Sequence, residues 1–505
     1  MTIHFRPHQQ EDFERTKDFP AYARLWEMRV GKTYPTIATA HYQFLKGTIT
    51  TVLLVAPNGV HLNWSRKAIP EMNREVSFPN HILEWSSAKS GTKGFQAEME
   101  KALAFNGLLW VCVNVEAIMI PTKKQPNKKT FTFLETLVKK RPTFLICDES
   151  HKLKDPQAKR TKAALRLSKF CPIKQNLTGT LVPKGPFDIW SQFNILDPNI
   201  LHDLTSDGKK VPMSFTAFKN HYGIFKPMRF GSGPVFNQLD ESQGDHGYKN
   251  LEQLYRQIAP YSSRLRQKDV MDVPDIVGGP TSENPSEGWR YFEMSPAQRK
   301  VYNELKNDLR TQLANGVEIT ASQAVVCLLR LQQISRGFVG DGETTHDLGE
   351  SKPSVDALLD ILDQVDGKVI IWCHFRADVD ILMTTLGAEA VRYDGQVPIN
   401  DRPAILERFQ TDPSVRYIVG TPACGGMGID LSAAKTTVFY SYDYNLVHWL
   451  QAIARMQGMN QVATALAVYV LIGADSTDEK CIAAIDRKED LAATVMGDKL
   501  KDILS

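Results

Sequence analysis

The sequence lacks the features of a membrane protein and of a secreted one. No apolar run approaches the ~18 residues that a bilayer-spanning helix needs, and the best of them covers only residues 465–474. The first seven residues show no basic stretch followed by an apolar one, so we expect no secretory signal. The 7 cysteines form no Cys-x-x-Cys pair, which argues against a disulfide framework or a zinc site. These absences predict a cytoplasmic protein.

Other classes are excluded by composition. The 505 residues include only 32 Gly and 27 Pro, which is ordinary usage and excludes collagen-like and low-complexity chains. With 42% hydrophobic and 23% charged residues, extended disorder is excluded as well. The net charge of +3 is too balanced to indicate a nucleic-acid partner, so any such binding must come from local basic patches. The length predicts about three structural units.

Short, continuously apolar runs recur in two separate regions of the chain. The first region holds them at residues 51–56, 108–113, 143–147 and 175–178, and the second at 368–372, 390–393, 416–419, 437–440 and 467–472. Runs of this kind, separated by helical stretches, are typical of parallel sheets that helices cover on both faces. The sequence therefore predicts an α/β protein with two lobes.

Between the two regions the sequence changes character. Residues 231–250, 278–288 and 340–354 are polar and rich in turn formers, whereas Leu251, Leu254 and Ile258 recur at helical spacing. We interpret residues 201–283 as a helical protrusion and residues 284–350 as connecting helices. The first lobe then covers residues 1–200 and the second residues 351–505.

A Gly-Lys-Thr turn, Gly31-Lys32-Thr33, opens a helical pattern ahead of the first apolar run. Such a turn offers backbone N–H groups and a positive helix end to a triphosphate; the Lys reaches the β- and γ-phosphates, and the Thr hydroxyl binds Mg²⁺. The motif is imperfect, because Trp26 and Arg29 stand where glycine is common. By itself the turn is equally compatible with an ordinary helix N-terminus.

Two adjacent carboxylates, Asp148 and Glu149, follow an apolar run at the edge where α/β sheets bind their ligands. In that position Asp148 would hold Mg²⁺, directly or through water, and Glu149 would orient the attacking water. The alternative is an ordinary solvated strand end. The Gly-Lys-Thr turn upstream favours the catalytic interpretation.

These residues carry a family resemblance. Asp148-Glu149-Ser150-His151 resembles motif II, of the DEAH type, in superfamily 2 helicases and translocases. Further motifs of the Swi/Snf-type branch follow in that family's order: a Q-motif at residues 5–9, motif Ia at 55–64, motif III at 177–190, motif IV at 368–375, motif V at 425–431 and motif VI at 451–461. With no accessory module in sight, the chain resembles a minimal motor core of the phage or bacterial kind, located in the host cytoplasm if a phage encodes it.

The resemblance implies two tandem RecA-like lobes with an insert between motifs III and IV, and ATP and Mg²⁺ as cofactors. The residues that it implies for ATP binding are Gln9, Gly31, Lys32, Thr33, Gly428, Asp430 and Gln451. Catalysis is implied for Lys32, Asp148, Glu149 and Arg455, Mg²⁺ binding for Thr33 and Asp148, and coupling for His151, Thr178 and Thr180.

Motif VI departs from the family's pattern. The first arginine is kept as Arg455, but Gly458 stands where the family has a second one. An arginine that stabilises γ-phosphate charge can be worth about 10³–10⁵ in rate. Either Arg455 acts alone, another cation such as Arg29 substitutes, or hydrolysis is slow.

Two basic patches fit the sequence-independent phosphate contacts that the family makes with DNA. One consists of Lys123, Lys124, Lys128, Lys129, Lys139, Lys140 and Arg141, and the other of Lys152, Lys154, Lys159, Arg160 and Lys162. Either patch is equally compatible with a solvated surface. Asn63 and Trp64 of motif Ia are further candidates for DNA contact, although a Trp here is as readily a core residue.

The resemblance implies a DNA-dependent ATPase: a monomeric translocase on duplex or branched DNA of any sequence, with replication or recombination proteins as candidate partners. Two alternatives stay open. One is a helicase or branch-migration enzyme of recombination, replication or repair. The other is an ATP-gated DNA-binding protein whose hydrolysis is impaired by the departures at Gly458 and Arg29.

Overall fold

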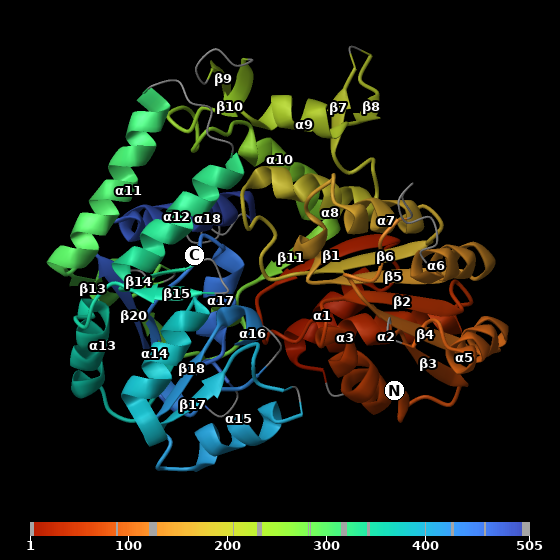
Figure 1. Ribbon diagram of the computed structural model, residues 1–505. Coiled ribbons are helices and arrows are strands. Elements are labelled where there is room, and N and C mark those ends of the chain that lie inside the picture. Colours follow the sequence, from red (N-terminus) through yellow and green to blue (C-terminus); the bar gives the residue numbers. More distant parts are fainter. Residues whose placement is uncertain are drawn as a thin grey trace. The chain divides into compact units, whose positions relative to one another are not determined.

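The computed structural model describes residues 5–86, 89–120, 129–205, 207–229, 235–280, 282, 284–314, 321–340, 344–398, 400–425, 429–458 and 461–496 (Figure 1). The chain divides into two compact units. Unit 1 comprises Met1–Ile224, Gln243–Asp272 and Leu491–Ser505, and unit 2 comprises Phe225–Ser242 and Val273–Asp490. No helix within the described ranges is both long and apolar enough to cross a membrane.

Unit 1 is built on a seven-stranded sheet in which every strand pair is parallel. From edge to edge the order is β11 (Ser262–Leu265), β1 (Ala21–Trp26), β6 (Ile173–Leu177), β5 (Thr143–Asp148), β2 (Thr51–Ala56), β4 (Leu108–Asn114) and β3 (Asn80–Glu84). The central strands β1, β2 and β5 are almost wholly buried, as expected for a sheet covered on both faces.

Helices cover both faces of this sheet because successive side chains of a strand point to opposite sides. Val52 and Leu54 enter one core, with helices α2 (Thr33–Leu45) and α4 (Ile69–Asn73), whereas Leu53 and Val55 enter the other. The remaining helices of these two layers are α1 (Pro7–Thr16), α3 (Val60–Asn63) and the π-helical turn η1 (Trp64–Ala68) on the first side, and α5 (Lys93–Ala104), α6 (Lys129–Lys140), α7 (Lys159–Ser168) and α8 (Ile189–Leu196) on the second.

The segment 201–283, interpreted from sequence as a helical protrusion, is only partly helical. Its described residues form the α-helices α9 (Phe215–Tyr222) and α10 (Leu251–Ile258), and in α10 the predicted positions Leu251, Leu254 and Ile258 are buried. It also contains the hairpins β7 (His202–Leu204) with β8 (Lys210–Pro212) and β9 (Phe225–Met228) with β10 (Phe236–Leu239). Its last strands, β11 and β12 (Asp275–Val277), belong to different sheets.

Unit 2 has a second sheet of seven strands, again with only parallel pairs. The order is β12, β20 (Ala465–Gly473), β19 (Ala434–Phe439), β16 (Lys368–Trp372), β18 (Tyr417–Gly420) and β17 (Ala390–Tyr393), and β13 (Trp289–Phe292) also pairs with β20. The prediction of two α/β lobes built on parallel sheets is confirmed.

The second sheet is also covered on both faces, since Ile370 and Trp372 enter one core and Val369 and Ile371 the other. The helices of this unit that follow β15 (Thr345–Asp347) are α13 (Pro353–Gln364), α14 (Arg376–Leu386), α15 (Arg402–Thr411), α16 (Pro422–Gly425), α17 (Leu446–Ala454) and α18 (Thr477–Met496).

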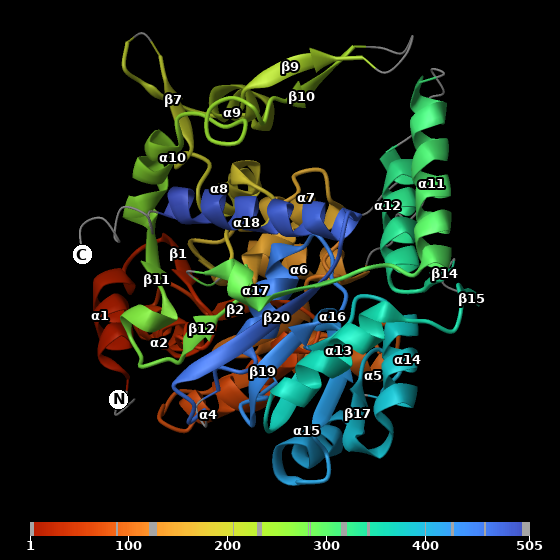
Figure 2. The same ribbon diagram turned by 90° about the vertical axis from the view of Figure 1, so that its left-hand side faces the viewer.

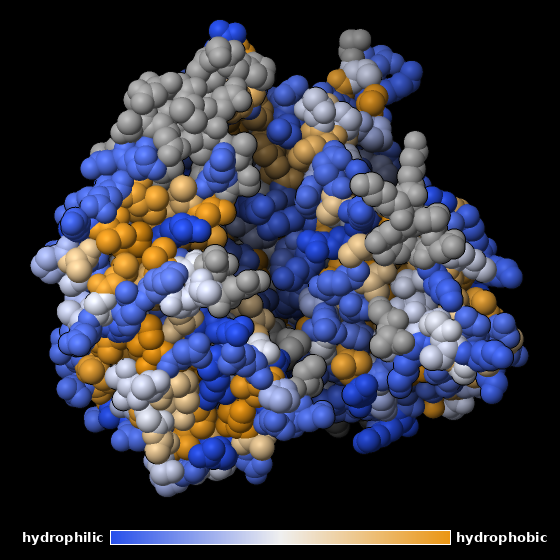
Figure 3. All heavy atoms as spheres, viewed as in Figure 1, coloured by the Kyte–Doolittle hydropathy of each residue, from blue (hydrophilic) through white to orange (hydrophobic). Residues whose placement is uncertain are grey.

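A helical hairpin precedes this set. Figures 1 and 2 both show α11 (Pro296–Ala314) and α12 (Ala321–Ser335) lying side by side, followed by the small hairpin of β14 (Phe338–Gly340) and β15. Tyr302 and Ile334 are buried between them. Val325 and Val326 of α12 are exposed by 55% and 48%, and Figure 3 shows hydrophobic side chains gathered on this part of unit 2.

Candidate nucleotide-binding site

The first helix of unit 1 holds the Gly-Lys-Thr turn in place. Gln9 accepts the Arg6 N–H through Oε1 at 2.9 Å, and its Nε2 donates to the Gly31 carbonyl at 2.9 Å. His8 Nε2 lies 2.9 Å from the Val30 carbonyl. Gly31 has φ +87°, and a Cβ there would lie 2.3 Å from Gln9 Nε2, so only glycine fits. Thus Gln9 and Gly31, predicted to share one site, do lie together.

Lys32 immediately precedes α2, and its ammonium is directed at the turn itself. Its Nζ donates to the carbonyls of Trp26, at 2.8 Å, and Glu27, at 3.0 Å. Burial lowers the pKa of Lys32, although Glu149 and Asp148 act to raise it. The nearby motif III is packed tightly against the same backbone, because a Cβ on Gly179 would lie 3.1 Å from the Trp26 carbonyl. Thr33, the predicted Mg²⁺ ligand, is the first residue of α2.

A buried arginine, Arg24, which the sequence analysis did not single out, connects to the start of α2 by hydrogen bonds. Arg24 of β1 is 0% exposed, and its Nε lies 2.6 Å from Asp12 Oδ2 of α1. Arg24 also donates to Thr36 Oγ1 at 3.0 Å, and Thr36 in turn donates to the Lys32 carbonyl at 2.8 Å. The ion pair therefore connects α1, β1 and the helix that carries Lys32 and Thr33.

Asp148 ends β5 with both carboxylate oxygens held. Its Oδ2 accepts the indole N–H of Trp64 at 2.8 Å, and its Oδ1 accepts the Glu149 backbone N–H at 2.9 Å. Burial, followed by the charge of Glu149, raises the pKa of Asp148, while Lys32 and the Trp64 hydrogen bond oppose the rise. The charge of Lys32 lowers the pKa of both Asp148 and Glu149, so these three residues are near enough to interact electrostatically.

Glu149 adopts the left-handed conformation, with φ 50°. Such backbone strain in a non-glycine residue is concentrated at functional sites. His151 Nδ1 lies 3.1 Å from Glu149 Oε2. Burial alone would raise the pKa of Glu149, but the hydrogen bond and charge of His151, together with the charge of Lys32, hold it well below its usual value. Glu149 is therefore ionised at neutral pH.

Motif II touches motif III through the same histidine. His151 Nδ1 is also 3.1 Å from Thr178 Oγ1. Because the Thr178 hydroxyl donates to the Thr180 carbonyl at 3.1 Å, His151 Nδ1 must be the donor. Thr178 Oγ1 accepts the Thr180 N–H at 3.1 Å as well, so His151, Thr178 and Thr180 form one network. The three predicted coupling residues are in contact.

For Trp64 the sequence left a stacking role and a core position open, and the structure has the core position. Trp64 is only 2% exposed, and its indole N–H donates to Asp148. Asn63, by contrast, is exposed.

The residues of the two predicted basic patches lie in different environments. Arg141 donates to backbone carbonyls of Phe105 at 2.8 Å and Thr50 at 3.0 Å, which is a structural role. Lys154 lies 3.7 Å from Asp188 Oδ2, whereas the charge of Lys152 acts on Glu149. Lys129 is exposed, and Lys123, Lys124 and Lys128 lie outside the described residues.

In unit 2 the predicted residues of motifs V and VI meet each other. The Leu431 N–H donates to the Arg455 carbonyl at 3.1 Å, and Arg455 and Gln451 are 6% and 8% exposed. Asp430 Oδ1 accepts the Ser432 N–H at 3.1 Å, and its carbonyl accepts Gln410 Nε2 at 2.6 Å. Gly428 lies outside the described residues.

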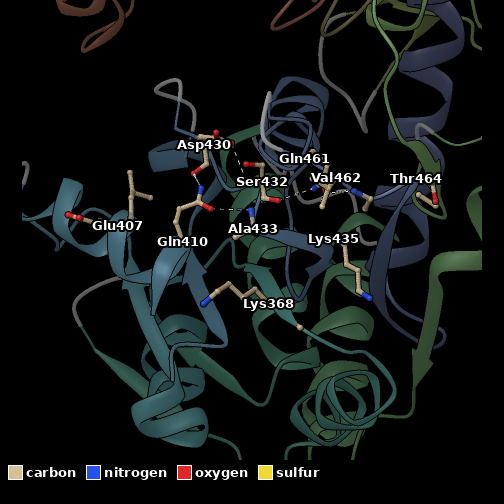
Figure 4. Close-up of a pocket in the computed structure, with 14 residues that line it drawn as sticks. Lys368, Glu407, Gln410, Asp430, Ser432, Ala433, Lys435, Gln461, Val462 and Thr464 are labelled. Carbon is tan, nitrogen blue, oxygen red and sulfur yellow. Dashed lines mark hydrogen bonds between the residues drawn. The ribbon is translucent and has the colours of Figure 1, made fainter. Parts of the chain in front are cut away.

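Asp430 also lines a cavity of about 1050 Å³ in unit 2, next to the start of β16, β19 and β20. Figure 4 shows Gln410 bridging Asp430 and Ala433 on one of its walls. The side-chain amides that line the cavity form hydrogen bonds with backbone groups of the same chain. Gln461 Nε2, for example, donates to the carbonyls of Ser432, at 3.2 Å, and Ala434, at 3.0 Å. Lys368 Nζ likewise donates to two backbone carbonyls. These hydrogen bonds hold the walls of the cavity in place.

Gly458, in the place of the second motif VI arginine, is packed against Asp430. A Cβ at Gly458 would lie 2.2 Å from Asp430 Oδ1 and 2.7 Å from Ser432 Cβ. The carboxylate of Asp430 thus occupies the space that the Cβ of any larger residue at position 458 would need. Nothing in the sequence pointed to this pairing.

Two known domain families match segments of this chain. The SNF2-related domain matches residues 26–337, more than half of the chain, and the helicase conserved C-terminal domain matches residues 353–457. The chain belongs to the SNF2-related family. The first match contains the Gly-Lys-Thr turn and motifs Ia, II and III, and the second contains motifs IV and V and Arg455 of motif VI, whereas the Q-motif at residues 5–9 precedes the first match.

Among curated proteins similar to this chain, the TATA-binding protein-associated factor MOT1 of Saccharomyces cerevisiae is 22% identical over 74% of this chain and 21% of its own length. An uncharacterised ATP-dependent helicase of Mycoplasma genitalium is 22% identical over 92% of this chain and 39% of its own. The chain thus spans only about a fifth to two fifths of the length of these relatives. Among solved structures, the SWI2/SNF2 ATPase core domain of Sulfolobus solfataricus is 19% identical, with 100% of this chain and 91% of its own covered and a TM-score of 0.39.

The residues present fit a Mg²⁺·nucleotide. Each Asp148 oxygen accepts one hydrogen bond, which leaves each a further lone pair, and Mg²⁺ prefers hard oxygen ligands of this kind. Among the described residues, no group of three or more His, Cys, Asp or Glu side chains is placed to hold a metal ion.

Proposed function

We propose that this chain is an ATP-dependent motor that moves along double-stranded or branched DNA. The observation that carries the proposal is the convergence of Lys32, Asp148 and Glu149 at the carboxyl end of the unit 1 strands, in a chain of the SNF2-related family. Parallel α/β sheets bind ligands at that edge, and the N-terminus of α2 favours phosphate.

The residues of unit 1 divide the chemistry among themselves. Lys32 exchanges its two backbone carbonyls for the β- and γ-phosphates of ATP. Asp148 and Thr33 would hold Mg²⁺, which when bound neutralises phosphate charge. Glu149, kept ionised by His151, accepts a hydrogen bond from the attacking water and orients it. The low pKa suits an orienting group better than a strong base.

The motor function also requires a contribution from unit 2. Arg455 is the cation that motif VI offers to the γ-phosphate, since Gly458 has no side chain to offer. Closure and reopening of the two lobes over each ATP would then become a step along the phosphate backbone of DNA. His151 and Thr178 couple the carboxylates to motif III during this cycle.

DNA-stimulated ATPase activity tests the proposal. We expect duplex DNA to raise the rate of phosphate release, and Lys32→Ala to abolish it. Lys46→Ala is the matched control, because Lys46 follows the other end of the same helix and pairs with Asp18 at the surface. Equal rates with and without DNA, at every salt concentration tested, would contradict a motor. Duplex, forked, four-way and single-stranded DNA and RNA are compared in the same assay.

A helicase or branch-migration enzyme shares every motif discussed above, and the Mycoplasma genitalium relative is named a helicase. The two activities separate in paired assays. A translocase displaces the third strand of a triplex without separating the duplex, whereas a helicase also displaces one strand of the duplex. Strand displacement by this chain would decide for the alternative.

A hydrolysis-impaired, ATP-gated DNA-binding protein is favoured by one observation, the glycine at position 458. Tight ATP binding with negligible phosphate release would support it. Restoring the arginine with Gly458→Arg alone is a poor test, because Asp430 blocks the first atom of any side chain there. The test therefore compares the double variant Gly458→Arg, Asp430→Ala with Asp430→Ala alone, because Asp430 is itself a predicted ATP-binding residue.

A further inference from the structure

We propose that Trp64 is a positioning residue for the carboxylate of Asp148, and that its indole N–H fixes the orientation in which Asp148 meets the Mg²⁺·nucleotide. This inference rests on the proposed ATPase function and deepens it. The two residues are 84 positions apart in sequence and meet only in the folded protein, with Nε1 at 2.8 Å from Oδ2.

The carboxylate of Asp148 is held from two sides. Trp64 donates to Oδ2, and the backbone N–H of Glu149 donates to Oδ1 at 2.9 Å. A carboxylate held by one oxygen still rotates about its Cβ–Cγ bond, whereas two donors on different oxygens fix its plane. Since the second donor belongs to the next residue, Trp64 is the restraint that comes from a different element.

Trp64 is itself rigidly placed. Its side chain is 2% exposed and belongs to the same core as Ile37 and Leu54. It opens the π-helical turn Trp64–Ala68, a wide turn that often marks functional sites. The turn is tied to β3, since Ser65 Oγ donates to Glu84 Oε2 at 3.0 Å and Arg66 Nε lies 2.9 Å from the same atom.

The chemistry of indole suits this task. An indole N–H is a donor only and carries no charge, so it neither binds a metal ion nor repels one. The charges that act on the Asp148 carboxylate come from Glu149 and Lys32. His151 and Lys152 act on Glu149, and Glu27 and Arg264 act on Lys32. Because Trp64 adds no charge to this set, its contribution is orientation.

A matched control lies in the same core. Trp110 of β4 is 0% exposed, and its indole Nε1 has no hydrogen-bond partner within the part of the chain that the structure describes. Trp64→Phe and Trp110→Phe therefore remove the same atoms from similarly buried rings, but only the first removes a hydrogen bond to a carboxylate.

The experiment measures nucleotide binding by the full chain, with ADP in Mg²⁺ and with ADP in EDTA, by calorimetry, and the Mg²⁺ concentration that half-saturates the ATPase. Loss of a group that orients a metal ligand typically costs about 10–100-fold in metal affinity. We expect Trp64→Phe to raise the half-saturating Mg²⁺ concentration by roughly this factor. Its affinity for ADP in EDTA stays at the wild-type value, and Trp110→Phe changes neither quantity.

Three results would overturn the inference. The half-saturating Mg²⁺ concentration could be the same in Trp64→Phe and Trp110→Phe, or it could be the same in Trp64→Phe and the wild type. Alternatively, Trp64→Phe could lose as much ADP affinity in EDTA as it loses in Mg²⁺. If the wild-type chain binds no nucleotide at all, the proposed function fails and the inference fails with it, which is a distinct outcome.

A second measurement does not depend on the folding of Trp64→Phe. The chain has 8 tryptophans, so its indole N–H signals are few enough to follow by nuclear magnetic resonance. In the wild-type protein, one signal should shift with MgADP but not with ADP in EDTA, and the same signal should move in Asp148→Asn. If no indole signal responds to Asp148→Asn, the hydrogen bond is absent and the inference is wrong.

Discussion

Gly458 and Asp430 form a pair whose coupling can be measured. We expect Gly458→Ala to destabilise unit 2, because the new Cβ would lie 2.2 Å from Asp430 Oδ1 and 2.7 Å from Ser432 Cβ. Non-bonded heavy atoms pack best at about 3.5–4.0 Å. Both neighbours must therefore move by roughly an ångström, which is an overpacked site rather than a tolerated one.

The magnitude follows from two opposing terms. Overpacking of this kind costs about 1–3 kcal/mol. Replacing glycine by alanine at a backbone conformation that alanine accepts offsets about 0.4–1 kcal/mol of this by restricting the unfolded chain. The net expectation is a loss of about 1–2 kcal/mol, or roughly 2–8 °C in the melting temperature of a unit of this size.

The assay is differential scanning calorimetry on four proteins: the wild type, Gly458→Ala, Asp430→Ala and the double variant. In the Asp430→Ala background only the clash with Ser432 Cβ at 2.7 Å remains, so Gly458→Ala should cost less than it does in the wild type. The coupling should thus reach about 1 kcal/mol or more. A Gly458→Ala effect that is the same in both backgrounds would refute the argument that Asp430 fills this space.

Two further changes are expected to act on stability. Asp12→Ala leaves Arg24 buried without its ion-pair partner at 2.6 Å and should cost about 3–5 kcal/mol in chemical unfolding, while the surface variant Glu14→Ala should cost little; equal effects would contradict the buried-pair assignment. Burial raises the pKa of Asp378 to about 7, so the folded carboxyl keeps a proton that an unfolded Asp releases above about pH 4. The free energy of unfolding of the wild type should therefore fall, relative to Asp378→Asn, as the pH rises from about 4 to about 7, and a parallel pH profile of the two proteins would be the contrary result. Asp360→Asn, at an exposed position of α13, serves as the control.

Much of the site could be predicted because its parts are local. A Gly-Lys-Thr turn that opens a helix, or a strand followed by two carboxylates, is encoded in a few consecutive residues. The parallel sheets were equally readable from runs such as residues 51–56 and 143–147, since both faces are buried. The strands β1 and β3 were not among the predicted runs. Arg24 interrupts the apolar pattern of β1, and His81 and Glu84 that of β3.

The sequence by itself therefore determined the two α/β lobes and the order of the motifs along them, because backbone geometry over a few residues depends on those residues. The tertiary structure alone decided the partners: Asp12 for Arg24, Asp148 for Trp64 and Asp430 for Gly458. A buried arginine, an indole and a glycine each have several possible environments. Which environment each residue has depends on packing between segments that are distant in sequence. The spacing of residues along the chain does not predict this packing.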